Sequence, residues 1–126
     1  MIVGLARHAE LSGYRISALF LEDGPLRAEM EAAGILTGVV DWGGGRRDLP
    51  GALRVWNWMR KHPAQVLHLH HGGRVTRFLA RMAGATVVVQ HVHSPIVEPE
   101  LSSVSHLSFT GADAVVVSSK AVADSL

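Results

Sequence analysis

The chain has 126 residues, 48% of them apolar, and this length and composition suit one domain with a hydrophobic core and exclude an intrinsically disordered chain. Its formal net charge of +1 argues against nucleic acid as a general partner. The absence of cysteine excludes disulfides and thiolate chemistry, and no uninterrupted apolar segment is long enough to cross a bilayer, so we expect a cytoplasmic protein.

The predicted elements alternate between helices and strands along the chain. In the first half we expect helix 2–11, strand 14–21, helix 25–33, strand 35–40 and helix 49–61. In the second half we expect strand 64–70, helix 74–82, strand 85–92, helix 101–110, strand 112–117 and a final helix from residue 120, capped by Ser118 or Ser119. Such alternation with short connections predicts an α/β fold, a Rossmann-like three-layer sandwich with a mostly parallel sheet.

The apolar spacing of two helices predicts which faces they bury. For helix 49–61 the expected stripe is Leu49, Leu53, Trp56 and Met59. For helix 74–82 the residues expected to face inward are Val75, Phe78, Leu79 and Met82. The same helix carries Arg74, Arg77 and Arg81 at helical spacing, which we interpret as a solvent-exposed face in preference to a phosphate-binding or membrane-contacting one.

The order of elements differs from a complete doubly wound sheet at its beginning. Such a sheet usually opens on a central strand followed by a glycine-bearing turn, whereas this chain opens on a helix. We therefore expect residues 1–126 to form a single, partial domain with its first strand missing. A partner chain or a rearranged strand order would fill that place.

Two predicted strands end in histidines. Strand 64–70 contains His68 and His70 and is followed by His71, and strand 85–92 contains His91 and is followed by His93. Histidines two residues apart on a strand face the same way. Because ligands of open α/β sheets bind beyond the carboxyl ends of the strands, these imidazoles mark the expected site.

The chemistry of these histidines leaves several interpretations open. Clustered imidazoles can bind zinc, copper or nickel, but the chain has no cysteine and no His-x-x-x-His pair on a helix, so we favour no metal. We interpret His68 as a structural core histidine. For His70, His71 and His93, ligand contact and a structural role stay equally open. Gly72 and Gly73 before a helix are a weak phosphate-binding signal, and a flexible turn is slightly favoured.

Several stretches, taken in order and spacing, resemble the N-terminal domain of a family 4 glycosyltransferase with the GT-B fold. The strand at 63–70 resembles that family's P-D-V-V-H-x-H segment, and residues 111–119 resemble its A-D-x-V-x-x-V-S strand and cap. Residues 5–16 and 21–26 resemble the helix and the turns around its second strand, and residues 87–94 resemble a strand ending in an acceptor-side histidine.

The resemblance implies the acceptor-binding half of a retaining glycosyltransferase that uses a nucleotide-sugar donor, with no metal and no other cofactor in this chain. It implies that His93 is the catalytic histidine of the site, with His91 competing for that place because the local spacing is ambiguous. The residues that it implies for substrate binding are His70, His71, Gly72, Gly73, His91 and Ser94.

The partners implied are a sugar, lipid or small-molecule acceptor and a C-terminal donor domain that this chain lacks; we expect no nucleic acid. Because the donor domain and the first strand are both missing, we expect no transferase activity from this chain alone. An alternative is a non-catalytic α/β binding or assembly module that acts through self-association or a partner chain. Contact with a membrane surface and a histidine-rich metal-binding protein are further alternatives.

Overall fold

The computed structural model describes residues 2–43, 47–70, 73–93 and 109–125. The first elements are α1 (Ile2–Leu11), β1 (Ser17–Phe20), α2 (Pro25–Ala32), β2 (Leu36–Val39) and α3 (Leu49–Lys61). They are followed by β3 (Val66–Leu69), α4 (Arg74–Met82), β4 (Val87–Val92), β5 (Ala114–Val117) and α5 (Lys120–Asp124). The predicted alternation is confirmed for these elements, whereas the helix expected over 101–110 falls, up to residue 108, outside the described residues.

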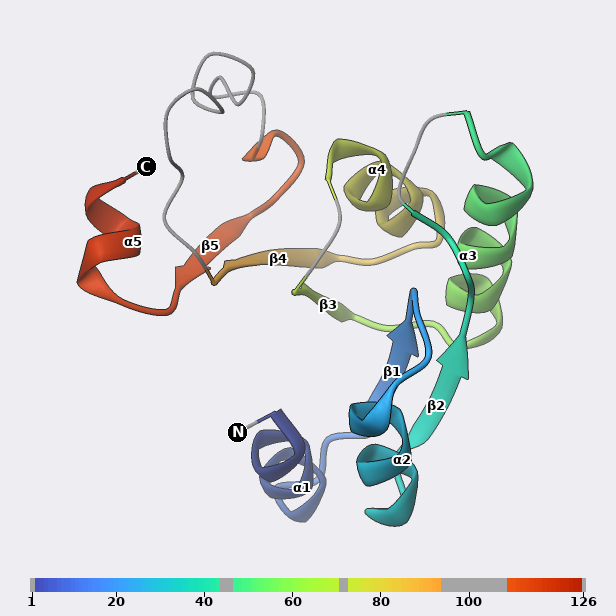
Figure 1. Cartoon of the computed structure of the whole chain (residues 1–126), viewed down its shortest axis with the longest axis vertical. Helices are drawn as coiled ribbons and strands as arrows, with labels where there is room; N and C mark the ends of the chain where they lie inside the picture. The colour runs from blue at the N-terminus through green and yellow to red at the C-terminus, as the bar shows by residue number, and fades with distance from the viewer. Residues whose placement is uncertain (1, 44–46, 71–72, 94–108, 126) are drawn as a thin grey trace. The chain divides into compact units, whose positions relative to one another are not determined.

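All pairings between described strands are parallel, and the strands form two sheets (Figure 1). The first sheet pairs β1 with β2, and the second has the order β3-β4-β5. The parallel α/β class is therefore confirmed. The chain divides into two compact units, residues 1–58 and 59–126, with the boundary inside α3. Among the described residues, no helix has both the length and the apolar character needed to cross a membrane.

The first unit has a small core between its helices and its sheet. Ala6 of α1, Met30 of α2 and Ile35 before β2 are each 6% exposed or less. Partly buried apolar residues pack around these three: Ile2, Val3, Ile16, Ala18, Phe20 and Ala33. The apolar stripes of two helices thus meet the side chains of the short parallel pair, which is how an amphipathic element gains stability.

Gly38 of β2 allows the indole ring of Trp58 to lie close to the strand backbone. A Cβ atom at this position would overlap the indole of Trp58, so only glycine leaves room for that ring beside β2. β2 runs through Gly38 without interruption. Glycine is tolerated in a strand where another group comes this near.

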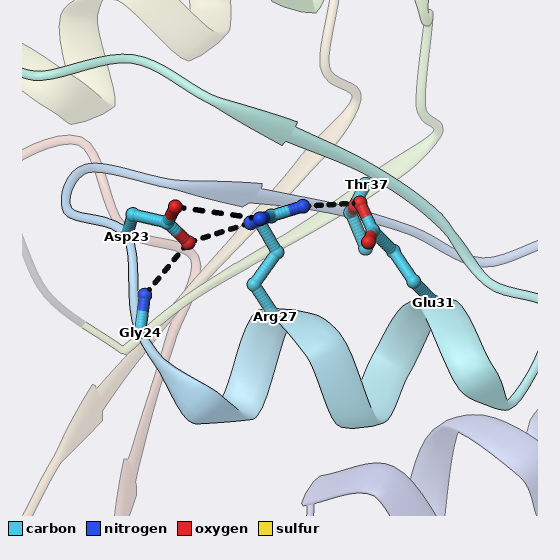
Figure 2. A network of polar contacts seen from close by, with 5 residues as sticks. All are labelled: Asp23, Gly24, Arg27, Glu31 and Thr37. Carbon is cyan, nitrogen blue, oxygen red and sulfur yellow. Dashed lines mark hydrogen bonds and ion pairs between the residues drawn. The ribbon is translucent and has the colours of Figure 1, made fainter.

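A polar network connects the elements of the first unit (Figure 2). The guanidinium of Arg27 on α2 donates from Nε to Asp23, at 2.6 Å, and from Nη1 to Glu31, at 2.5 Å. Thr37 of β2 donates its hydroxyl to Glu31 at 2.6 Å. The hydrogen bond from Arg27 lowers the pKa of Asp23, and those from Thr37 and Arg27 lower the pKa of Glu31. The network thus joins the turn after β1, α2 and β2.

The buried face of α3 differs from the predicted stripe. Val55 and Met59 are 0% and 8% exposed, but Leu49 and Leu53 are 67% and 61% exposed. The reason is local packing around Trp42, which is buried and lies so close to Gly51 that a Cβ there would overlap its ring. This contact turns the Gly51 and Val55 side of the helix inward. Met59 of the predicted stripe is thus correct, and Leu49 and Leu53 are wrong.

The buried face of α4 also differs from the prediction. Thr76, Arg77 and Ala80 are buried, whereas Phe78 and Met82 are 62% and 59% exposed. The prediction that Phe78 and Met82 face inward is therefore wrong, as is the interpretation of Arg77 as part of a solvent-exposed face. A helix is oriented by all its contacts, and the polar contacts of Arg77 described below decide this one.

Candidate functional site

Four histidines follow one face of the second sheet, at and just beyond the ends of β3 and β4. The register pairs His68 with Val89 and Leu69 with Gln90. Because side chains alternate along a strand, His68 shares a face with His91, while Leu69 and Gln90 point to the other face. Arg77 of α4 binds Gln90, so α4 covers that other face. We call His68, His70, His91 and His93 the histidine ladder.

The rings of the histidine ladder are in mutual contact. Ring centroids are 4.5 Å apart for His68 and His70, 5.3 Å for His68 and His91, and 4.1 Å for His91 and His93. The rings of His70 and His93 are 5.1 Å apart, and Nδ1 of His70 lies 2.9 Å from Nε2 of His93. In that hydrogen bond one nitrogen carries the proton and the other must be unprotonated. The pairing of β3 with β4 therefore brings His68 and His70 of one strand into contact with His91 and His93 of the other.

The environment of His68 favours the neutral form of its ring. The pKa of His68 is lowered by partial removal of its ring from solvent, and then by the neighbouring rings of His91 and His93. His91 has both ring nitrogens shielded from solvent, and within the described part of the chain neither has a hydrogen-bond partner. Neutral imidazole both donates and accepts hydrogen bonds and is also the form that binds metals.

A buried polar contact supports the strands from the opposite face of the sheet. Gln90 is 6% exposed and Arg77 is 2% exposed. The guanidinium of Arg77 donates to Oε1 of Gln90 at 3.0 Å and to the carbonyl of Thr110 at 2.9 Å. The Gln90 amide donates to the carbonyl of Leu69 at 3.3 Å. Because α4, β3 and β4 are joined in this way, the strand ends that carry the histidines keep their register.

A second polar contact fixes the beginning of β5 against β4. Asp113 accepts a hydrogen bond from the backbone N–H of Val88 at 2.7 Å and forms an ion pair with Arg81. The pKa of Asp113 is lowered, first by the Val88 N–H and then by Arg81. At the other end of β5, the Ser118 hydroxyl donates to the carbonyl of His93 at 2.9 Å. The backbone of His93 is thereby held in place.

Comparison with known families shows to which family the chain belongs. The model of Glycosyltransferase Family 4 matches residues 1–126. The chain belongs to this family. A glycosyltransferase-like function is therefore supported, in agreement with the resemblance read from the sequence. Comparison with curated proteins and with solved structures found no significant match.

This family 4 domain brings together some of the predicted site residues. His70, His91 and His93 lie in one cluster, as expected for neighbouring strands. His68 is an exposed member of the same cluster, so its interpretation as a core histidine is wrong. Gly73 is the N-cap of α4, where its backbone is extended and a Cβ would meet open space. The predictions for His71, Gly72 and Ser94 lie outside the described residues.

Sequence reasoning missed the residues that hold the site of this family 4 domain in position. Gln90 was visible as a polar residue inside the apolar run Val87–Val92, and a buried polar side chain needs a partner. Arg77 was visible only as one of three arginines at helical spacing. The sequence holds no signal that selects Arg77 from these three, because its partner comes from a different element.

Proposed function

We propose that this chain is the acceptor-binding part of a retaining glycosyltransferase of the GT-B type, whose nucleotide-sugar donor is bound by a C-terminal domain. The observation that carries the proposal is the contact of His70 with His93 just beyond the carboxyl ends of two parallel strands. Ligands of open parallel sheets bind at this position. Membership of family 4 supplies the reaction class.

His93 is the residue proposed to contact the reacting acceptor hydroxyl. Its side chain is exposed, and its backbone carbonyl is held by the Ser118 hydroxyl. A neutral imidazole at this place offers an acceptor for a hydroxyl proton. His70 keeps the His93 ring oriented through the 2.9 Å hydrogen bond, and the His91 ring stacks on that of His93 with a centroid distance of 4.1 Å.

The substrate-binding set proposed around His93 contains His70, His91 and Gly73, together with His71, Gly72 and Ser94 from the adjoining segments. The acceptor is a sugar, a lipid or a small hydroxylated molecule. Glycosyl transfer develops charge on the donor sugar, and stabilising that charge requires groups of the donor domain in fixed geometry. This chain alone is therefore proposed to bind acceptor without transferring sugar.

Nuclear magnetic resonance of the histidine rings tests the proposal. The full chain is titrated with a panel of free sugars, lipid-linked sugars and small polyols, and separately with nucleotide sugars. We expect an acceptor to perturb the His70 and His93 ring signals and the His93→Ala variant to lower the affinity about 3- to 10-fold, the effect of one lost hydrogen bond.

The matched control is His8→Ala, because His8 is an exposed histidine on α1 in the other unit. It should leave the titration unchanged. Sugar transfer by the chain alone, or acceptor binding that is indifferent to both His70 and His93, would contradict the proposal. A chain that binds no acceptor and self-associates instead would favour the assembly module.

A further inference from the structure

We propose that His68, His70 and His91 form a binding site for a divalent transition-metal ion, with zinc as the representative ion. Each of these histidines offers one ring nitrogen, and the three nitrogens lie within 4.8 Å of one another. The lack of cysteine and of a helical His-x-x-x-His pair argues against a metal at the level of sequence. Pairing of β3 with β4 creates a different arrangement, with two ligands from one strand and the third from its neighbour.

The unsatisfied nitrogens of His91 are a second, independent observation. Both ring nitrogens are shielded from solvent, and neither finds a hydrogen-bond partner among the residues that the structure describes. Buried polar atoms in folded proteins are almost always paired, and each exception indicates strain, a functional role, or a water or ion at that place. An ion shared with His68 and His70 would satisfy one of these two nitrogens.

The donor set selects the class of ion. Imidazole nitrogens suit zinc, copper, nickel and cobalt, whereas magnesium and calcium prefer oxygen ligands. Tetrahedral zinc at about 2.0–2.1 Å from each nitrogen places its ligands about 3.4 Å apart. The three nitrogens must therefore approach by at most about 1.4 Å from the 4.8 Å observed, and histidine side chains can do so by turning about χ1 and χ2.

The surroundings of the three histidines agree with an accessible metal site. His68 is exposed, so an ion can reach the group from solvent. His93 contacts Nδ1 of His70 and is placed to orient that ring, as outer-shell partners of metal ligands do. Three protein ligands would leave a fourth position for water.

Titration of the full chain, with any affinity tag removed, tests the site. Zinc binding is measured by calorimetry, with cobalt as the spectroscopic probe. We expect one ion per chain and a tetrahedral cobalt spectrum. Removing an outer-shell partner typically costs 10- to 100-fold in affinity, so loss of a ligand in His68→Ala should cost about 100-fold or more.

His68→Ala is the decisive variant because this side chain is exposed and its removal should leave the fold intact, which circular dichroism checks. His91→Gln serves as the second ligand variant, and His8→Ala is the control with an exposed histidine elsewhere. Zinc should also shift the ring ¹⁵N signals of His68, His70 and His91. Wild-type affinity in His68→Ala and His91→Gln, or no saturable binding by the wild-type chain, would overturn the proposal.

The metal site does not rest on the proposed function. His68 belongs only to the metal group, and the acceptor proposal does not use it. His68→Ala should therefore lose zinc and keep acceptor binding. If the chain binds acceptor but no zinc, only the metal site fails, and if it binds zinc through His68 but no acceptor, only the acceptor role fails.

Discussion

The two compact units of this family 4 domain use their polar side chains differently. In the first unit Asp23, Arg27 and Glu31 lie on the surface and pair with one another. In the second unit Arg77 and Gln90 are buried and join α4 to the sheet. Exposed ion pairs contribute little to stability, whereas a buried polar group that loses its partner is costly. The second unit thus contains a buried hydrogen bond between polar side chains, and the described residues of the first unit contain no such buried pair.

The two units also differ in where their polar side chains lie relative to the candidate site. In the first unit the guanidinium of Arg27 on α2 pairs with the carboxylate of Asp23 in the turn after β1 and with that of Glu31 on the same helix (Figure 2). In the second unit the buried contact lies on one face of the sheet, and the histidines lie on the other. A binding site needs side chains that are held in place by the residues behind them. Here the Arg77–Gln90 contact lies behind the row of imidazoles. The lesson is that the polar groups that build the site are separate from those proposed to act in it.

The largest expected effect comes from breaking the buried contact of the second unit. Arg77→Ala leaves Oε1 of Gln90 and the carbonyl of Thr110 without this donor, so we expect a loss of about 2–4 kcal/mol in the free energy of unfolding. Urea denaturation followed by circular dichroism measures it. Arg27→Ala, which removes an exposed guanidinium from the first unit, should have a clearly smaller effect. Equal losses in the two variants would abolish the contrast between the units.

A steric change should affect the first unit more than any of its ion pairs does. Gly38→Ala places a methyl group on the indole of Trp58, so we expect a loss of about 1–3 kcal/mol and a shift in tryptophan emission. Gly4→Ala is the control, because Gly4 lies inside α1 with open space around it. Alanine there should stabilise the chain by about 0.5–1 kcal/mol. A neutral Gly38→Ala would mean that Trp58 does not pack against β2.

The smallest effect concerns the pH dependence of the Asp113 contact. The pKa of Asp113 is lowered in the folded chain, so the unfolded chain binds its proton at higher pH than the folded chain does. Its stabilising contribution is therefore present above the ordinary value of 3.8 and is lost as pH falls through the lowered pKa. Asp113→Asn should reduce stability at neutral pH and flatten this acid dependence. Urea midpoints over this pH range measure it, and an unchanged acid slope would show that Asp113 is not responsible.

Much of the secondary structure was predictable because its determinants are local. The bounds of α1, α3 and α4 agree with the apolar spacing and the breaks after them, and Gly13 and Gly84 end two of these helices with positive φ angles. Ser119 accepts a hydrogen bond from the Val122 N–H and caps α5, as its position predicts. The strands are shorter than predicted: β1, for example, covers only Ser17–Phe20 of the expected 14–21.

The sequence by itself determined the order of elements, the parallel α/β class, and the fact that His68 shares a strand face with His70, because these follow from spacing along the chain. It also carried the motifs that indicate family 4. Only the tertiary structure decided that β3 lies beside β4, and so brings His70 to His93. It also decided which sides of α3 and α4 are buried, since Trp42 and Gln90 orient these helices. The physical reason is that one side of a helix is buried only when other residues pack against it. Those residues lie elsewhere in the chain, so the spacing within the helix does not reveal them.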